Sequence, residues 1–135
     1  MNWTLEVVTV PVSDVDRSKK FYSEKLGFVV DHDTSGPGFR FVQLTPPGSG
    51  CSVVIGMENG MPPGSLKGLQ LVVNDLDAAR AQLVSRGVEV SEISVYGQNG
   101  PRPREDGDDL NNVGFVHFAD PDGNAWAVQQ ITNRS

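Results

Sequence analysis

Hydrophobic and polar residues follow the same order in two parts of the chain. Residues 10–30 read VPVSDVDRSKKFYSEKLGFVV and residues 71–90 read LVVNDLDAARAQLVSRGVEV. Each segment has an apolar run, an Asp-x-Asp step, a stretch with helical spacing that closes at a glycine, and a second apolar run. The offset between the copies is 61 residues at the first Asp and 60 at the closing glycine. A repeat of this length predicts two similar units within one fold, with a site between them.

The first unit begins with a predicted strand over residues 5–12, which are rich in β-branched side chains. Ser13 or Asp14 is a candidate N-cap for a helix that runs to about Leu26. Gly27 tolerates the left-handed conformation in which many helices end. Apolar runs separated by turn formers predict three further strands, near residues 28–34, 39–45 and 51–57.

The second unit repeats this plan, with a strand near residues 68–74 and a helix that ends at Gly87. Further strands are predicted near residues 88–95, 113–119 and 125–131. Each unit therefore reads strand–helix–strand–strand–strand, which gives an α+β fold with eight strands and two helices. We expect one domain over residues 1–135, with units of approximately 1–60 and 66–135.

Residues 96–112 depart from the repeated plan, because they form a long polar stretch that is rich in glycine and proline. Loops of this length are commonly either lids over a site or mobile insertions. Both interpretations stay open: a mobile surface loop, or a lid whose arginine and aspartate side chains close over a ligand.

Composition and charge exclude several classes of partner. The net charge is −6, and Lys and Arg are scattered, apart from a group on the first predicted helix that reads as a solvated face. No apolar stretch approaches membrane-spanning length, and the first residues do not resemble an export signal. The single Cys51 excludes an internal disulfide and suits a reducing compartment. We expect a cytoplasmic protein with no nucleic-acid or membrane partner.

Three motifs, taken in this order, resemble the vicinal oxygen chelate superfamily, which includes glyoxalase I, extradiol dioxygenases and the bleomycin-resistance proteins. They are VPVSDVDRSKKFYSEKLGF, LVVNDLDAARAQLVSRGVEV and FADPDGNAWAVQ. The resemblance covers nearly the whole chain. It implies two paired βαβββ units whose eight strands form a curved, U-shaped cavity, with the helices on the convex face. It also implies a homodimer.

The resemblance further implies where metal ligands would stand in a metal-dependent member. Those members carry a His seven residues before the Asp that starts each helix, and a Glu on the last strand of each unit. Here these positions hold Val7, Gly68, Ala127 and a residue near Val54, none of which can bind a divalent ion. An alternative site would have to use His32, His117 or Cys51 with nearby acids. We expect no metal and no cofactor.

Strand alternation places Thr9, Gln70, His117 and Gln129 on the cavity side of their strands, among apolar walls. A few polar groups in an apolar concavity are typical of a small-molecule site. Gln70 and Gln129 have a second interpretation, in which they only hydrogen-bond each other across strands. His117 is the one titratable group placed inward, and it is either an acid–base catalyst or a hydrogen-bonded structural residue.

The alternation of side chains does not decide which face of one predicted strand is buried. In the strand over residues 39–45, either Phe39 and Phe41 or Val42 and Leu44 could form the core set.

The main functional hypothesis is a metal-free protein that binds an aromatic or antibiotic-like small molecule, with sequestration of that molecule as one form of this function. Thr9, Gln70, His117 and Gln129 would orient the ligand. The alternative is a glyoxalase-like lyase or isomerase, or a dioxygenase-related enzyme, that acts on a small carbonyl or aromatic substrate with His117 as acid or base. A degenerate module for partner interaction is a third hypothesis, and it predicts no small-molecule stabilisation.

Overall fold

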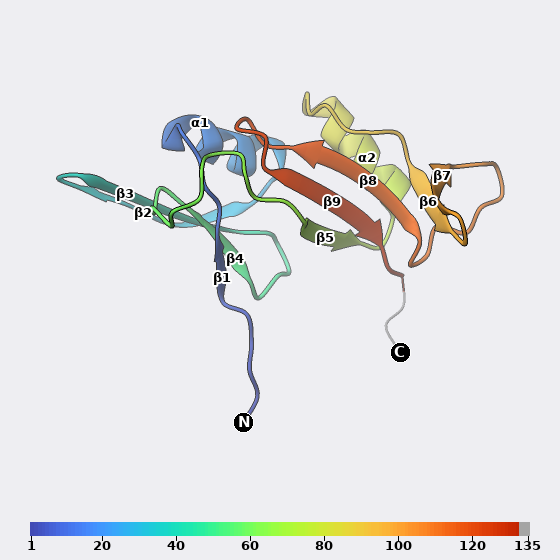
Figure 1. Cartoon of the computed structure of the whole chain (residues 1–135), viewed down its shortest axis with the longest axis horizontal. Helices are drawn as coiled ribbons and strands as arrows, with labels where there is room; N and C mark the ends of the chain where they lie inside the picture. Colours follow the sequence, from blue (N-terminus) through green and yellow to red (C-terminus); the bar gives the residue numbers. More distant parts are fainter. Residues whose placement is uncertain (133–135) are drawn as a thin grey trace. The chain divides into compact units, whose positions relative to one another are not determined.

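The computed structural model describes residues 1–132, which divide into two compact units (Figure 1). Unit 1 comprises Met1–Leu66 and Asp120–Asn124. Unit 2 comprises Lys67–Ala119 and Ala125–Ser135, of which residues up to 132 are described. Each unit contains one mixed sheet and one helical segment. The α+β fold with paired units, expected from the repeat, is confirmed.

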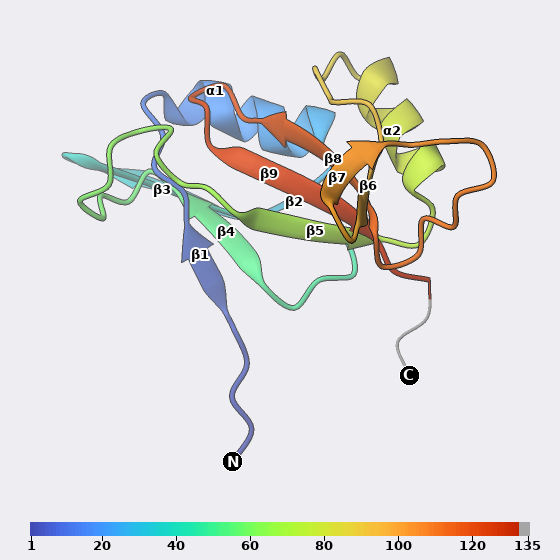
Figure 2. The same cartoon turned by 45° about the vertical axis from the view of Figure 1, so that its right-hand side comes forward.

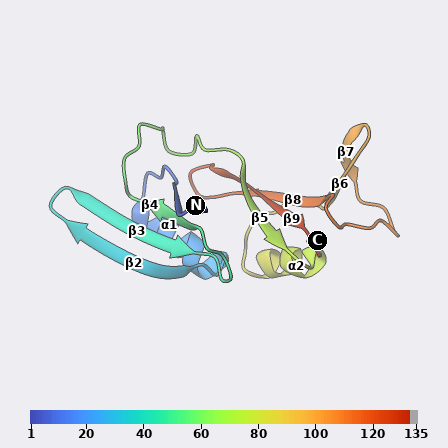
Figure 3. The same ribbon diagram turned by 90° about the horizontal axis from the view of Figure 1, so that it is seen from below.

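Unit 1 holds a four-stranded sheet in the order β1-β4-β3-β2. Its elements are β1 (Val7–Thr9), α1 (Val15–Lys20), the π-helix η1 (Phe21–Lys25), β2 (Val29–Gly36), β3 (Phe39–Thr45) and β4 (Ser52–Ile55). β1 runs parallel to β4, and the other neighbours are antiparallel. Figure 3 shows β2 and β3 as a long hairpin.

The first helix begins where its cap residue predicts. Of the two candidates, Asp14 is the N-cap, and its carboxylate accepts a hydrogen bond from the Arg17 backbone N–H at 3.0 Å. The helix continues as a π-helical turn from Phe21 and ends before Gly27, whose φ of 78° is the left-handed conformation expected of a helix end. Tyr22 of this turn is fully buried and anchors the helix to the core.

Unit 2 holds a five-stranded sheet in the order β5-β9-β8-β6-β7 (Figure 2). Its elements are β5 (Leu69–Val73), α2 (Leu76–Ser85), β6 (Ser94–Gly97), β7 (Gly100–Pro103), β8 (Gly114–Ala119) and β9 (Ala125–Gln130). Asp75 caps α2 by accepting from the Ala78 backbone N–H at 3.1 Å, as Asp14 caps α1. The parallel pair β5–β9 corresponds to the parallel pair β1–β4 of unit 1.

Two details of unit 2 differ from the sequence expectation. The strand predicted near residues 88–95 begins only at Ser94, and a further strand, β7, lies inside the segment 96–112. β6 and β7 form a hairpin. The chain that follows the hairpin is tied to α2, because the Arg104 guanidinium binds the Asp77 carboxylate. Part of the expected loop is therefore regular structure with defined anchors.

The exposed fractions show which side chains of β3 face the core, a question that the alternation of residues could not answer. Val42 and Leu44 are fully buried whereas Phe39 is 53% exposed, so the valine and leucine form the core set of β3. The core set predicted for β8 and β9 is confirmed, since Val116, Phe118, Trp126 and Val128 are all buried. Among the described residues, no helix has the length and apolar character needed to cross a membrane.

Candidate functional site

Two glutamines lie together on the face of the unit 2 sheet that is opposite the buried set. Gln70 on β5 donates through Nε2 to Oε1 of Gln129 on β9 at 2.6 Å. Gln129 in turn donates through its own Nε2 to the Asn112 backbone carbonyl at 2.8 Å. The cross-strand hydrogen bond anticipated between the two amides therefore exists, and it fixes the amide planes on an exposed surface.

His117 lies on β8, on the same open face, and its backbone is held firmly. Its N–H donates to Ser91 Oγ and its carbonyl accepts from the Ser91 N–H, both at 2.9 Å. The imidazole is exposed, and within residues 1–132 no hydrogen bond or ion pair joins it to another side chain. Its position on the sheet is thus fixed by the backbone, while the ring itself faces solvent.

An aromatic row extends from the imidazole. The rings of Phe115 and His117 are nearly parallel, at 5°, with centroids 6.3 Å apart. Tyr96 on β6 lies on the other side of Phe115, with centroids 4.9 Å apart. We call Tyr96, Phe115 and His117 the aromatic row. Together with the glutamine pair it gives unit 2 a surface of π-faces beside fixed amide groups.

A hollow of about 400 Å³ adjoins the end of this row. His117 lines it together with Pro101, Arg102 and Pro103 of the β6–β7 hairpin. Arg102 does not present a free charge to the hollow, because it forms a paired hydrogen bond with the Asp108 carboxylate at 2.9 Å for both contacts. Arg102 in turn lowers the pKa of Asp108 to about 2. The hollow therefore combines the imidazole with two prolines and Ile93, and Ser91, Glu92 and Ser94 add polar groups to its lining.

Thr9, the fourth predicted site residue, belongs to unit 1. It is half-buried on β1, directly opposite Val54 of β4. Its place beside Gln70, His117 and Gln129 stays a prediction. Unit 1 has a separate hollow of about 450 Å³, between the segment that follows β1 and the loop of residues 56–63.

The strand register shows that residues of the candidate site occupy corresponding positions in the two units. In unit 1, Val54 faces Thr9 on one side and Gln43 on the other. In unit 2, Ala127 faces Gln70 on one side and His117 on the other. Thr9 and Gln70 are therefore equivalent positions, as are Gln43 and His117. The sequence carries a signal for this in FVQL at residues 41–44 and FVHF at residues 115–118.

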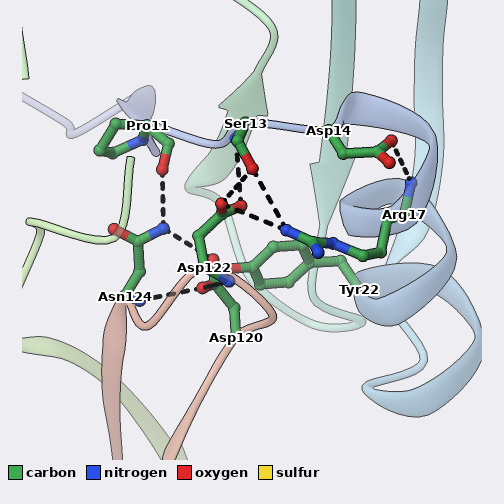
Figure 4. Close-up of polar contacts among 8 residues, drawn as sticks. All are labelled: Pro11, Ser13, Asp14, Arg17, Tyr22, Asp120, Asp122 and Asn124. Carbon is green, nitrogen blue, oxygen red and sulfur yellow. Dashed lines mark hydrogen bonds and ion pairs between the residues drawn. The ribbon is translucent and has the colours of Figure 1, made fainter. Parts of the chain in front are cut away.

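The Asp-Pro-Asp-Gly-Asn turn between β8 and β9 has a structural role within unit 1. Figure 4 shows the buried Asp120 carboxylate accepting from Tyr22 Oη at 2.7 Å and from Asn124 Nδ2 at 2.8 Å. Asn124 Nδ2 also donates to the Pro11 carbonyl at 2.8 Å. This network joins the turn to the end of β1 and to the first helix.

Asp122 of the same turn accepts hydrogen bonds from the Ser13 backbone and hydroxyl, and from Arg17 Nη2 at 3.2 Å (Figure 4). Among residues 1–132 no histidine joins this cluster, so those residues do not supply the base that would activate the Ser13 hydroxyl as a nucleophile. Its effect is to fix the start of α1.

A comparison with models of known protein families identifies the family of this chain. The model of the Glyoxalase/Bleomycin resistance protein/Dioxygenase superfamily matches residues 4–128. The chain belongs to this superfamily. A comparison with the curated proteins gives no match.

Several solved structures are similar to this chain over almost their whole length. One is TnmS3, an antibiotic binding protein from Streptomyces sp. CB03234, with 35% identity, 96% of this chain and 97% of that chain covered, and a TM-score of 0.76. A glyoxalase/bleomycin resistance protein from the same strain has 36% identity, 94% and 100% coverage, and a TM-score of 0.72. A superfamily member from Sphaerobacter thermophilus DSM 20745 has 29% identity, 96% and 98% coverage, and a TM-score of 0.73.

The residues of this chain do not fit the metal that the metal-dependent members of the superfamily bind. The strand register makes Val54 the counterpart of Ala127, so the two Glu positions hold hydrocarbon side chains. The two His positions hold Val7, which has a hydrocarbon side chain, and Gly68, which has none. Within residues 1–132, no group of three or more His, Cys, Asp or Glu is arranged to hold a metal ion.

Two further residues that could donate to a metal ion, His32 and Cys51, lie away from these four positions. His32 is exposed on β2, and Cys51 is half-buried beside β4, with its thiol directed to the Ser52 carbonyl. In the part of the chain that the structure describes, neither residue belongs to a group of three or more possible metal donors.

Proposed function

We propose that this protein binds a small, partly aromatic organic molecule without a metal ion and without changing it chemically. The observation that carries the proposal is the aromatic row beside the glutamine pair on the open face of the unit 2 sheet. The similarity to TnmS3, which is named as an antibiotic binding protein, supports a ligand of the antibiotic type.

The chemistry of this surface suits a flat ligand. Aromatic pairs gain about 0.5–1.5 kcal/mol beyond the area that they bury. A planar ligand that loses about 200 Å² of apolar surface to the row gains about 5 kcal/mol before the costs of binding. The fixed amides of Gln70 and Gln129 offer groups that orient a carbonyl or hydroxyl at the ligand edge. Thr9 is the further orienting residue that we expect.

A titration with doxorubicin and with bleomycin tests the proposal, since one is a planar polycyclic molecule and the other a larger antibiotic with a small aromatic part. Thermal stabilisation reports binding to the native state. Phe115→Leu and His117→Ala are expected to weaken binding about tenfold each, which corresponds to about 1.4 kcal/mol.

His32→Ala is the matched control, because His32 is the other exposed histidine and lies in unit 1. We expect it to leave binding unchanged. Equal losses in His32→Ala and His117→Ala, or no stabilisation by either compound, would contradict the proposal. So would about one tightly held divalent ion per chain that is lost in His117→Ala.

A second candidate is a lyase or isomerase reaction on a small carbonyl compound, with His117 as acid or base. The observation that favours it is the exposed imidazole at the edge of the hollow formed with the β6–β7 hairpin. Mass spectrometry of the ligand after incubation separates the two functions. A binder returns its ligand unaltered, whereas an enzyme yields a product whose formation is abolished in His117→Ala.

Cellular location belongs to the same proposal. The lone Cys51 suits a reducing compartment, so we place the protein in the cytoplasm.

A further inference from the structure

The hydrogen bonds of the glutamine pair run in one direction, and a backbone carbonyl sets that direction. The amide of Gln129 lies 2.8 Å from the Asn112 carbonyl oxygen, which can only accept a hydrogen bond. The nearest amide atom of Gln129 must therefore be Nε2, which leaves its Oε1 to face Gln70. Because that oxygen can only accept, the Gln70 atom 2.6 Å away must be Nε2. If either amide turned over, two acceptors or two donors would face each other.

The Asn112 carbonyl is itself held in place. Asn112 has φ 67°, a left-handed conformation that asparagine adopts more readily than most residues. Its N–H donates to the Gln130 carbonyl at 2.8 Å. The preceding Asn111 accepts through Oδ1 from the Thr132 N–H at 2.7 Å. The group that sets the direction of the two amides is therefore fixed by backbone hydrogen bonds to the end of β9.

Gln70 is the last residue of this series, and it presents an acceptor that is not filled. Its Nε2 donates to Gln129, and among residues 1–132 no donor contacts its Oε1. Gln70 is exposed, and it belongs to unit 2 together with Gln129 and Asn112. A molecule that covers Gln70 removes water from Oε1, and an acceptor that is left without a partner costs free energy. A ligand carbonyl can accept from the second N–H of Nε2, but it cannot satisfy Oε1.

The strand register places Gln70 across from the aromatic row. Ala127 on β9 lies directly opposite Gln70 on one side and His117 on the other. Neighbouring strands lie about 4.8 Å apart, so the backbones of Gln70 and His117 are separated by about 10 Å. The side chain between them is only a methyl group. A flat ring system that contacts His117 and lies over Ala127 therefore brings its edge to Gln70.

We propose that the ligand carries a hydrogen-bond donor, either a hydroxyl or an amine N–H, on the ring edge that meets Gln70. This inference rests on the proposed function, because it specifies the chemistry of the molecule bound at the same site. A donor satisfies Gln70 Oε1, whereas an ether or a hydrocarbon edge leaves that oxygen covered and unpaired. A site that forms a hydrogen bond to a polar group discriminates strongly against analogues that lack the group. The site therefore selects phenols and aromatic amines over their methyl ethers and parent hydrocarbons.

Pyrene derivatives that share one ring system test this selectivity. The probes 1-hydroxypyrene and 1-aminopyrene carry a donor, whereas 1-methoxypyrene and pyrene carry none. All are fluorescent, so titration of the dilute probe with the full chain gives each dissociation constant. We expect each donor probe to bind about tenfold tighter than the other two, which corresponds to about 1.4 kcal/mol. The methoxy probe keeps the oxygen and the amine probe has none, so the series separates hydrogen-bond donation from the presence of an oxygen.

The double variant Gln70→Met/Gln129→Met tests which side chain accepts the hydrogen bond. Both residues are replaced, because removal of Gln70 alone would leave Gln129 Oε1 unfilled in its place. We expect the advantage of the donor probes to fall below about twofold, since the interaction between the two groups is lost. Pyrene is expected to bind as it does to the wild-type chain. Gln82→Met is the matched control, because Gln82 is an exposed glutamine on α2 of the same unit, and it is expected to keep the full advantage.

The outcomes separate this inference from the proposed function. Equal binding of all the probes by the wild-type chain, or tighter binding of 1-methoxypyrene, would overturn the donor requirement and leave the proposed function intact. An advantage that persists in the double variant, or that is lost equally in Gln82→Met, would overturn the assignment of Gln70. Failure of every probe to bind would contradict the proposed function and this inference with it.

Discussion

The hydroxyl of Tyr22 provides a quantitative test of the turn network that fixes the first helix. Tyr22→Phe removes one oxygen and leaves the ring in place. The lost contact is the 2.7 Å hydrogen bond to Asp120 Oδ2. Tyr22 is 0% exposed and Asp120 only 5% exposed, so water does not readily replace the donor.

The expected change in the free energy of unfolding depends on how many hydrogen-bond donors the Asp120 carboxylate keeps. A hydrogen bond to a charged group contributes about 1.5–3 kcal/mol. Asp120 keeps three donors in the variant: Asn124 Nδ2 at 2.8 Å, the Asn124 N–H at 2.9 Å and the Asp122 N–H at 3.0 Å. We therefore expect the free energy of unfolding to fall by about 2 kcal/mol, near the middle of that range. For a chain of this length this lowers Tm by about 6 °C.

Urea unfolding followed by circular dichroism measures the change, with Tyr96→Phe as the control. Tyr96 is an exposed tyrosine in the other unit, and removal of its hydroxyl is expected to change the free energy of unfolding by less than about 0.5 kcal/mol. Equal losses of stability in Tyr22→Phe and Tyr96→Phe would refute the role assigned to the buried hydroxyl. That result would mean that the buried hydroxyl contributes nothing beyond its exposed counterpart.

Three further predictions concern other parts of the fold. Asp75→Ala removes the cap of α2, and chemical denaturation is expected to show a loss of about 1 kcal/mol. Gly56 has φ 97°, and a Cβ there would clash with the Arg40 carbonyl oxygen. Gly56→Ala is therefore expected to lower the free energy of unfolding by about 2–4 kcal/mol. A loss below about 0.5 kcal/mol would contradict the close packing. Hydrogen bonds from Arg40 and Lys19 lower the pKa of Asp33 from 3.8 to about 2. This depressed pKa stabilises the fold above pH 3.8, and the contribution is lost as the pH falls toward 2. Asp33→Asn is therefore expected to weaken the dependence of stability on pH in that window, measured by unfolding at several pH values.

Local patterns were sufficient to predict most of the two units. Asp14 and Asp75 precede helical spacing, and both act as N-caps. The prediction failed where local rules conflict with tertiary context. β7 contains Pro101 and Pro103, and proline in a sequence argues against a strand, yet an edge strand tolerates it because one side needs no ladder hydrogen bonds.

The face of β3 could not be predicted because both sets of alternating residues are apolar. Burial of Val42 and Leu44 depends on which side of the sheet α1 covers, and no local pattern records that. The match of FVQL to FVHF would have transferred the assignment from β8, where alternation identified the core set correctly.

The strand positions of two candidate residues could be predicted, whereas their role in a site stays a prediction. Gln70 and Gln129 lie together on the open face as the strand alternation indicates, and the sequence interpretation also foresaw their mutual hydrogen bond. Tyr96 was missed as a neighbour of Phe115, because it falls in the segment expected to be a loop. The pairing of β6 with β8 brings the two rings together, and this pairing joins residues whose contact no local sequence pattern encodes. The assembly of Thr9 with the unit 2 residues stays a prediction.

The duplicated strands explain how the fold persists while the family's metal ligands are absent. Because side chains alternate along a strand, one face carries the core and the other is free to vary. Core positions stay apolar in both copies, as Val42 and Val116 show, whereas the opposite face has diverged to Gln43 in one copy and His117 in the other. A substitution on the open face of the unit 2 sheet removes few packing contacts, so the sheet can be kept while that face changes. The same freedom allows an aromatic row in unit 2, and it explains why the repeat predicts the architecture well and the ligand poorly.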